Sequence, residues 1–139
     1  ISNPAGTENP YKIKDELQSM MPTNVGIFRT GNELEEGLKS IHDLKERFKN
    51  IRPPTKTRAF NMDKVWILEL SGNLDVAELV CTGAIRRIES RGAHFRRDYD
   101  KRDDDNWLHH TLATYTPSGP EFSTSEVDLS KYPPEERKY

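Results

Sequence analysis

The side chains best suited to chemistry cluster between positions 91 and 110. Five aspartates lie at positions 98, 100, 103, 104 and 105, and several carboxylates close together could hold a hard cation such as calcium or magnesium. The run lacks the alternating ligands, mid-loop glycine and distal glutamate of a calcium-binding loop, and Arg96, Arg97, Lys101 and Arg102 interrupt it. The pattern therefore favours an ion-paired loop, and we expect no metal ligands.

Histidines in the same region offer little for catalysis. His109 and His110 are adjacent, so on a strand they point to opposite faces and cannot chelate one ion as a pair. His94 follows a glycine, Gly92, that could close a helix, and a histidine there can bond the free carbonyls of the helix end. No nucleophile-elbow pattern is present, so a hydrolase is disfavoured and no catalytic residue is predicted.

Nucleotide binding also leaves no signature in this sequence. A flavin or dinucleotide site needs a glycine-rich phosphate loop at a strand-to-helix junction, and the eight glycines are scattered without such a pattern. We therefore expect no cofactor to be bound by these 139 residues alone.

Charge and composition exclude several classes of binding partner and site. A net charge of −2 and a pI near 6.1 provide no basic field for nucleic acid. Cys81 is the only cysteine, which excludes an internal disulfide or a cluster ligated within the chain and suggests a reducing, intracellular setting. The apolar runs are far shorter than the ~20 residues that a membrane-spanning helix needs, so direct membrane insertion is not expected.

The elements that must position these residues are helices. At 139 residues the chain fits one domain, and 33% hydrophobic residues suit a narrow bundle or part of a larger protein. A short helix is expected over 11–21, ended by Pro22, a second over 32–50, and a third from an Asn61 N-cap to about Ser90. In the third, the expected apolar stripe includes Val65, Leu68, Leu74, Ala77, Val80, Ala84, Ile85 and Ile88.

Past Gly92 the helical period disappears. Residues 109–115 and 122–127 alternate loosely around Pro117-Ser118-Gly119-Pro120, which predicts a hairpin with short strands, and the tail from Asp128 should be extended. The predicted fold is all-α: a lead-in over 1–9, a spectrin-repeat-like three-helix bundle over 10–90, and an irregular extension over 91–139 within the same domain. The knot of Val25, Ile27 and Phe28 is expected to pack on the bundle as a connection.

Three stretches resemble one family. Glu89-Ser90-Arg91-Gly92-Ala93-His94, continued by Arg96, Asp98, Arg102-Asp103-Asp104, Asn106-Trp107 and His110-Thr111, is similar to the flavoprotein subunits of succinate dehydrogenase and fumarate reductase. Asn24 to Arg29 and the terminus Pro133-Pro134-Glu135-Glu136-Arg137-Lys138-Tyr139 resemble the same subunits. Together these stretches span nearly the whole chain and match the C-terminal region of that family.

The resemblance implies an assembly role for this part of an oxidoreductase. In the family, FAD and the dicarboxylate substrate are held by domains that precede this segment, so the fragment alone should be inactive. It would pack on the N-terminal flavin-binding domain of its own chain and present a loop to the iron–sulfur subunit, placing it in the cytoplasm, peripheral to the membrane. The expected docking residues are Arg91, Gly92, His94, Arg96, Asp98, Arg102, Asp103, Asp104, Trp107 and His110.

Two alternatives stay open from the residues alone. The SRGAH-type motif also resembles L-aspartate oxidase, a flavoenzyme without an iron–sulfur partner. A stand-alone helical-bundle adaptor would explain the high charge and the missing active site. The sequence does not distinguish succinate oxidation from fumarate reduction, because direction depends on partners outside this chain.

Overall fold

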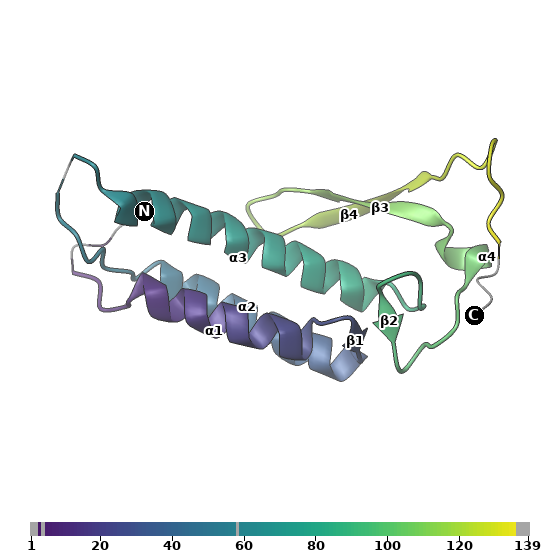
Figure 1. The fold of residues 1–139 in the computed structure, drawn as a ribbon, viewed down its shortest axis with the longest axis horizontal. Helices are drawn as coiled ribbons and strands as arrows, with labels where there is room; N and C mark the ends of the chain where they lie inside the picture. Colours follow the sequence, from purple (N-terminus) through teal and green to yellow (C-terminus); the bar gives the residue numbers. More distant parts are fainter. Residues whose placement is uncertain (1–2, 4, 58, 136–139) are drawn as a thin grey trace. The chain divides into compact units, whose positions relative to one another are not determined.

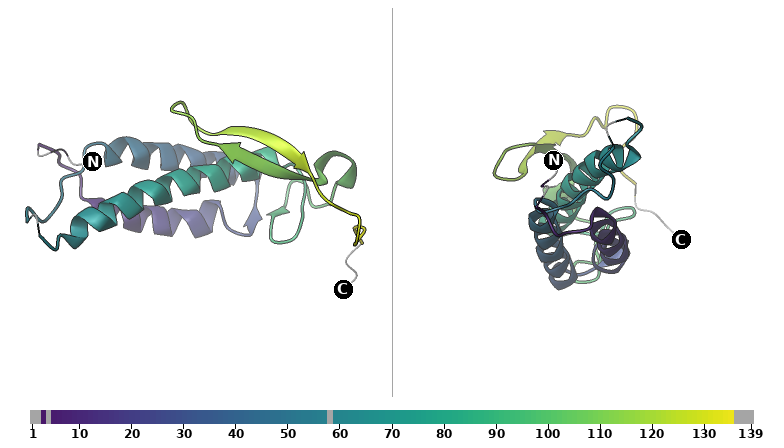
Figure 2. Two further views of the ribbon diagram at one scale, coloured as in Figure 1. Left: turned by 90° about the horizontal axis from the view of Figure 1, so that it is seen from above. Right: turned by 90° about the vertical axis from the view of Figure 1, so that its left-hand side faces the viewer.

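The computed structural model describes residues 3, 5–57 and 59–135 of the chain. It divides into two compact units, residues 1–102 and 103–139, which are described separately below. The first unit contains three helices: α1 (Pro10–Asn24), α2 (Gly31–Phe48) and α3 (Met62–Arg86). They lie side by side in both directions of view (Figures 1 and 2), which confirms the predicted three-helix bundle.

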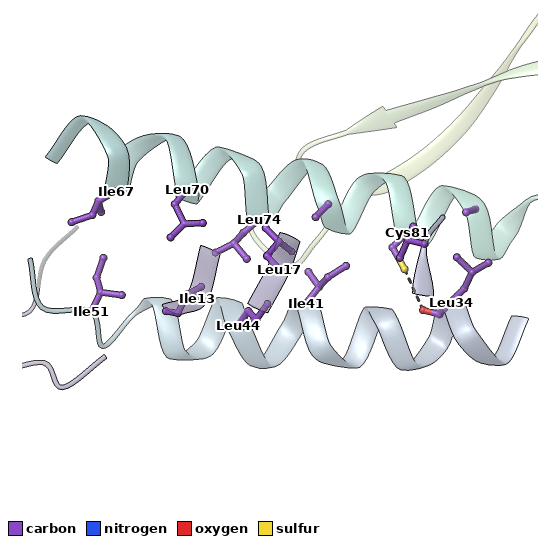
Figure 3. Close-up of a cluster of buried hydrophobic side chains, with 13 residues drawn as sticks. Ile13, Leu17, Leu34, Ile41, Leu44, Ile51, Ile67, Leu70, Leu74 and Cys81 are labelled. Carbon is purple, nitrogen blue, oxygen red and sulfur yellow. Dashed lines mark hydrogen bonds between the residues drawn. The ribbon is translucent and has the colours of Figure 1, made fainter. Parts of the chain in front are cut away.

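The core of the bundle follows a heptad pattern on α3. Its buried residues are spaced alternately three and four apart: Ile67, Leu70, Leu74, Ala77, Cys81 and Ala84. This spacing keeps one stripe of the helix against two neighbours over its whole length. Figure 3 shows the stripe facing Leu34, Ile41 and Leu44 of α2, with Ile13 and Leu17 of α1 between them.

Cys81 belongs to this core. Its Sγ donates a hydrogen bond to the carbonyl oxygen of Leu34 at 3.2 Å (Figure 3), and burial raises the pKa of its thiol to about 11. A thiol with a raised pKa is a poor nucleophile at neutral pH, so Cys81 acts as a small apolar core residue.

The outer face of α3 differs from the prediction. Val65, Leu68 and Val80 were expected in the apolar stripe but are exposed, as is Val76. Ile88, also expected there, is exposed and lies beyond the end of α3 at Arg86. The physical reason is that, within the described residues of the first unit, α3 packs against α1 and α2, and a narrow heptad stripe is enough to bury that contact surface. Apolar residues around the rest of the helix therefore do not indicate burial.

The start of α1 is held by side chains. The Asn9 side chain accepts a hydrogen bond from the Tyr11 N–H at 2.9 Å, and Pro10 occupies the first turn, where its missing N–H has no cost. Tyr11 also donates from Oη to Asp63 Oδ1 at 2.6 Å, which joins the N-termini of α1 and α3.

The prediction that Pro22 ends α1 is wrong. The helix continues to Asn24, and the N–H of Val25 still bonds the Met21 carbonyl at 2.9 Å. Because Pro22 lies in the last turn, it removes one hydrogen bond there without interrupting a long helix.

Helix α2 begins one residue earlier than predicted, with Thr30 as its N-cap. The Thr30 hydroxyl accepts from the Glu33 N–H at 3.3 Å, and the Glu33 carboxylate accepts from the Thr30 N–H at 2.8 Å. This reciprocal capping box corresponds to the sequence pattern Thr-x-x-Glu, a signal that apolar periodicity alone does not detect.

Helix α3 starts at its predicted N-cap, Asn61, but ends at Arg86, before the expected Ser90. Gly92 has a positive φ of 59°, but it lies in a later turn and does not close the helix, as it was expected to. The residue at the helix end, Arg87, is extended. Side chains from further along the chain, described below, satisfy the last carbonyls instead.

A two-residue parallel pairing forms the end of the bundle near Arg86. Strand β1 (Phe28–Arg29) pairs with β2 (Phe95–Arg96), placing Phe28 opposite Phe95 and Arg29 opposite Arg96. Val25 is buried as expected, but Ile27 and Phe28 are exposed, so the predicted apolar knot packs only in part.

The second unit contains the predicted hairpin. Strand β3 (His109–Thr114) pairs antiparallel with β4 (Glu121–Glu126), with His109 opposite Glu126 and Thr114 opposite Glu121. A single-turn helix that was not predicted, α4 (Asp104–Trp107), precedes it, capped by the Asp103 carboxylate on the Asn106 N–H at 3.1 Å. Residues 127–135 contain no helix or strand, and 136–139 lie outside the described residues.

Candidate docking interface

Arg96 is the central residue of the loop that follows α3. Its Nη1 donates to the carbonyl oxygens of Ala84 at 3.0 Å, Ile85 at 3.2 Å and Arg87 at 3.4 Å. These are the free carbonyls of the helix end, where a cation also complements the helix dipole. The side chain is only 3% exposed, so Arg96 caps α3 from within the fold.

Asp98 completes this cap. Its carboxylate accepts two hydrogen bonds from Arg96 Nε and Nη2, each at 2.8 Å, and one from the Gly31 N–H at 2.9 Å. The bonds from Arg96 hold the pKa of Asp98 well below its usual range. Because Gly31 is the first residue of α2, this pair ties the start of α2 to the end of α3.

His94 bonds the helix end, as predicted. Its Nε2 lies 3.0 Å from the Arg87 carbonyl oxygen, and because a carbonyl can only accept, Nε2 must carry the proton. Burial lowers the pKa of His94, and the charges of Arg29, Arg96 and Arg87 lower it further. The imidazole is therefore a neutral structural donor and a poor general acid.

Glu89 is a buried site residue that the sequence analysis did not single out. Its side chain is fully buried and forms ion pairs with Arg87 and Arg91, the latter at 2.8 and 2.9 Å through two nitrogens. The pattern Arg-x-Glu-x-Arg at 87–91 was the available signal, since an extended chain places alternate side chains on one face. Paired arginines offset the cost of burying this carboxylate.

Gly92 lies at the tip of a tight turn. Arg91 and His94 exchange backbone hydrogen bonds of 2.8 and 3.0 Å across it. A Cβ added at Gly92 would meet nothing within 4 Å, so the constraint there is the positive φ and not crowding.

The expected docking residues thus fall into different environments. His94, Arg96 and Asp98 build the turn, and Gly92 is exposed at its tip, as is Arg102 at the end of the first unit. Arg91, also in the first unit, pairs with the buried Glu89. The remaining four lie in the second unit: Asp103 caps α4, Asp104 lies in its first turn, the rings of Trp107 and His109 are 5.4 Å apart, and His110 pairs with Ser125.

The potential metal ligands of the described residues are dispersed. No group of three or more His, Cys, Asp or Glu among them could hold a metal ion. A groove of about 420 Å³ between α1 and α2 is open and lined by Glu16, Met20, Lys39, Ser40, Asp43 and Leu44. Its carboxylates would repel a pyrophosphate, and the groove has no glycine-rich helix start of the kind that binds one.

The geometry therefore defines a helical bundle with an arginine-rich turn at one end. The model of the family described as fumarate reductase flavoprotein C-term matches residues 14–139. The chain belongs to this family, the C-terminal domain of the FAD-binding flavoprotein subunit. Family membership does not favour L-aspartate oxidase or an unrelated adaptor.

Individual relatives agree with the family match. The fumarate reductase flavoprotein subunit of a Serratia strain is 43% identical over 137 residues, covering 96% of this chain and 23% of the relative. The succinate dehydrogenase flavoprotein subunit of Bacillus subtilis is 38% identical, with 96% and 23% covered. The chain thus spans about a quarter of the length of these relatives.

Solved structures show the same fold. A chain of Escherichia coli quinol fumarate reductase superposes with a TM-score of 0.91 at 37% identity, covering 97% of this chain and 24% of that one. Mycobacterium smegmatis Sdh1 gives a TM-score of 0.82 at 32% identity, covering 95% and 23%. No helix in the described residues is both long and apolar enough to cross a bilayer.

Proposed function

We propose that this chain is the C-terminal helical domain of a flavoprotein that interconverts succinate and fumarate, passing electrons through FAD and iron–sulfur clusters. The observation that supports this most strongly is the match to the family model over residues 14–139. Within the parent protein, FAD and substrate are held by the preceding domains. The helical domain, residues 10–90 with its extension over 91–139, contributes no catalytic residue and acts in assembly.

The proposed partners are the flavin-binding domain of the same chain and the iron–sulfur subunit. The turn around Gly92 and the arginines beside it support this role, because guanidinium groups can pair bidentately with carboxylates and fix the register of a contact. Through that complex the domain would lie in the cytoplasm at the membrane surface, without entering the bilayer.

The activity is tested in the full-length parent protein. Its reading frame upstream of Ile1 should encode a flavin-binding domain, and the purified protein should carry flavin and oxidise succinate or reduce fumarate. The 139-residue chain alone should show no flavin absorbance. An upstream sequence without a flavin domain, or a stoichiometric flavin band on the short chain, would overturn the proposal.

Docking is tested with two surface variants of the full flavoprotein, Gly92→Glu and Arg102→Glu. We expect both to weaken association with the iron–sulfur subunit, measured by co-purification and sedimentation. Arg52→Glu is the matched control, because Arg52 is exposed in the connection between α2 and α3. That connection lies at the other end of the bundle from the loop between α3 and β2 (Figure 1). Unchanged assembly in both test variants would reject this docking surface.

A further inference from the structure

Arg29 carries a charge that the described part of the chain does not neutralise. It lies half-buried on β1 opposite Arg96, and its Nε is buried without a hydrogen-bond acceptor among residues 3, 5–57 and 59–135. None of these residues places a carboxylate within ion-pair distance of it. Arg96, by contrast, is fully paired with Asp98 and the end of α3.

The other groups facing Arg29 do not compensate it. Cys81 of α3 is a neutral thiol at ordinary pH. Arg96, on β2, adds a second positive charge, and His94 adds a neutral ring. Burial lowers the pKa of Arg29, and the charge of Arg96 adds to this effect. A buried donor without an acceptor is unfavourable, so a carboxylate supplied from outside would stabilise Arg29.

Exposed apolar side chains lie next to this cation. Ile27 is 57% exposed and Phe28 is 59% exposed, although Phe28 already packs edge-on against Phe95 at 5.4 Å. The Arg97 guanidinium lies 5.8 Å from the Phe28 ring and keeps a second positive charge beside it. An aromatic anchor flanked by arginines is the usual composition of a protein-binding hot spot.

From this arrangement we infer that Ile27, Phe28 and Arg29 form a docking site for an acidic, apolar segment of the parent flavoprotein. An Asp or Glu of that segment pairs with the Arg29 guanidinium, and a neighbouring apolar side chain packs on Phe28. The inference rests on the proposed function, because it assigns the segment to the part of the parent protein that precedes this chain.

The positive charge of the site and the need for a constantly bound partner favour an occupant from the same polypeptide. The site carries Arg29 and Arg97, so the complementary surface must be acidic. A half-buried unpaired guanidinium is best matched by a partner that is always present, and covalent linkage provides a high effective concentration. Relatives contain about four times the length of this chain, which leaves ample sequence for such a segment.

The segment can be identified by photo-crosslinking in the full-length flavoprotein. Phe28→p-benzoylphenylalanine should crosslink to a peptide that lies before residue 1 and contains Asp or Glu. Phe60→p-benzoylphenylalanine is the matched control, since Phe60 is fully exposed in the connection before α3. A Phe28 crosslink only to a second copy, to the iron–sulfur subunit, or to a peptide without acidic residues would overturn the inference.

Arg29→Gln provides a second test that depends on the sign of the effect. In the full-length protein this change removes an ion pair, so the thermal midpoint should fall. In the 139-residue chain it removes an unpaired charge, so the midpoint should stay or rise. Arg52→Gln, which alters an exposed residue in the connection between α2 and α3, should have little effect in either. The same sign for Arg29→Gln in both proteins would reject the site.

These outcomes are separable from failure of the proposed function. Bound flavin and succinate oxidation are measured on the same full-length preparation. A flavin-containing, active protein without the Phe28 crosslink contradicts only the docking site, whereas a protein without flavin or activity contradicts the proposed function.

Discussion

At the scale of single residues, the most consequential position is Arg96. One guanidinium caps the end of α3 and pairs with a carboxylate that holds the start of α2. Its role could not be inferred from charge alone, because an arginine among neighbouring charges usually lies on the surface. What distinguishes Arg96 is burial. An exposed ion pair contributes little to the free energy of unfolding, whereas removing one partner of a buried pair is strongly destabilising.

Arg96→Ala should lower the free energy of unfolding of the 139-residue chain by about 3 kcal/mol, because carbonyls and the Asp98 carboxylate lose their donors. Urea unfolding followed by circular dichroism measures this. Arg97→Ala, at an exposed neighbour, should change it by less than about 0.5 kcal/mol. Equal effects of the two variants would show that the cap contributes little.

His94 should make stability depend on pH. Because its pKa is lowered in the folded state, the unfolded chain binds the proton more tightly. The contribution is therefore fully present above the ordinary value of 6.5 and declines as the pH falls from there through the folded pKa. Urea titrations between about pH 8 and pH 5 should show this decline in the native chain.

His94→Gln should flatten that decline, since glutamine can still donate to the Arg87 carbonyl but does not titrate. The exposed His110 supplies the control, and His110→Gln should leave the decline in place. An identical pH profile in the native chain and His94→Gln would show that another group is responsible.

At the scale of elements, α3 has two faces that look alike in sequence. Leu74 is 1% exposed and Val76 is 57% exposed, although both are aliphatic and two residues apart. Leu74→Ala should cost about 2–5 kcal/mol because it leaves a cavity in the core. Val76→Ala should change stability by less than about 0.5 kcal/mol.

Both variants of α3 can be compared by urea unfolding of the same chain. A cost above 1 kcal/mol for Val76→Ala would mean that the outer face of α3 is packed in solution. The comparison also separates apolar composition from burial, which helical periodicity did not do for Val65, Leu68 or Val80.

Element boundaries followed the local signals when those were complete. Asn61 as the N-cap of α3 and the hairpin around residues 117–120 were predicted correctly. The end of α3 was not, because its caps come from His94 and Arg96, about eight and ten residues beyond Arg86. A helix end satisfied by distant side chains carries no local sequence signal.

At the scale of the whole molecule, the buried hydrophobic core found among residues 3, 5–57 and 59–135 extends from Ile13 to Ala84. The second unit is a single hairpin with a one-turn helix, and an isolated hairpin is marginal in water. Ending the chain after Arg102 should therefore retain the helical circular dichroism and a cooperative urea transition. Loss of cooperativity in residues 1–102 would show that the bundle depends on residues 103–139.

The sequence by itself determined the three long helices, the hairpin, the family and the absence of a nucleotide-binding motif. These features depend on local periodicity, turn residues and motif spacing, which can be recognised without knowledge of the fold. Only the tertiary structure decided that Arg96 and Asp98 face inward, that Glu89 is buried between arginines, and that Arg29 has no partner among the described residues. The physical reason is that burial and pairing depend on which distant segments meet, and sequence spacing does not encode that directly.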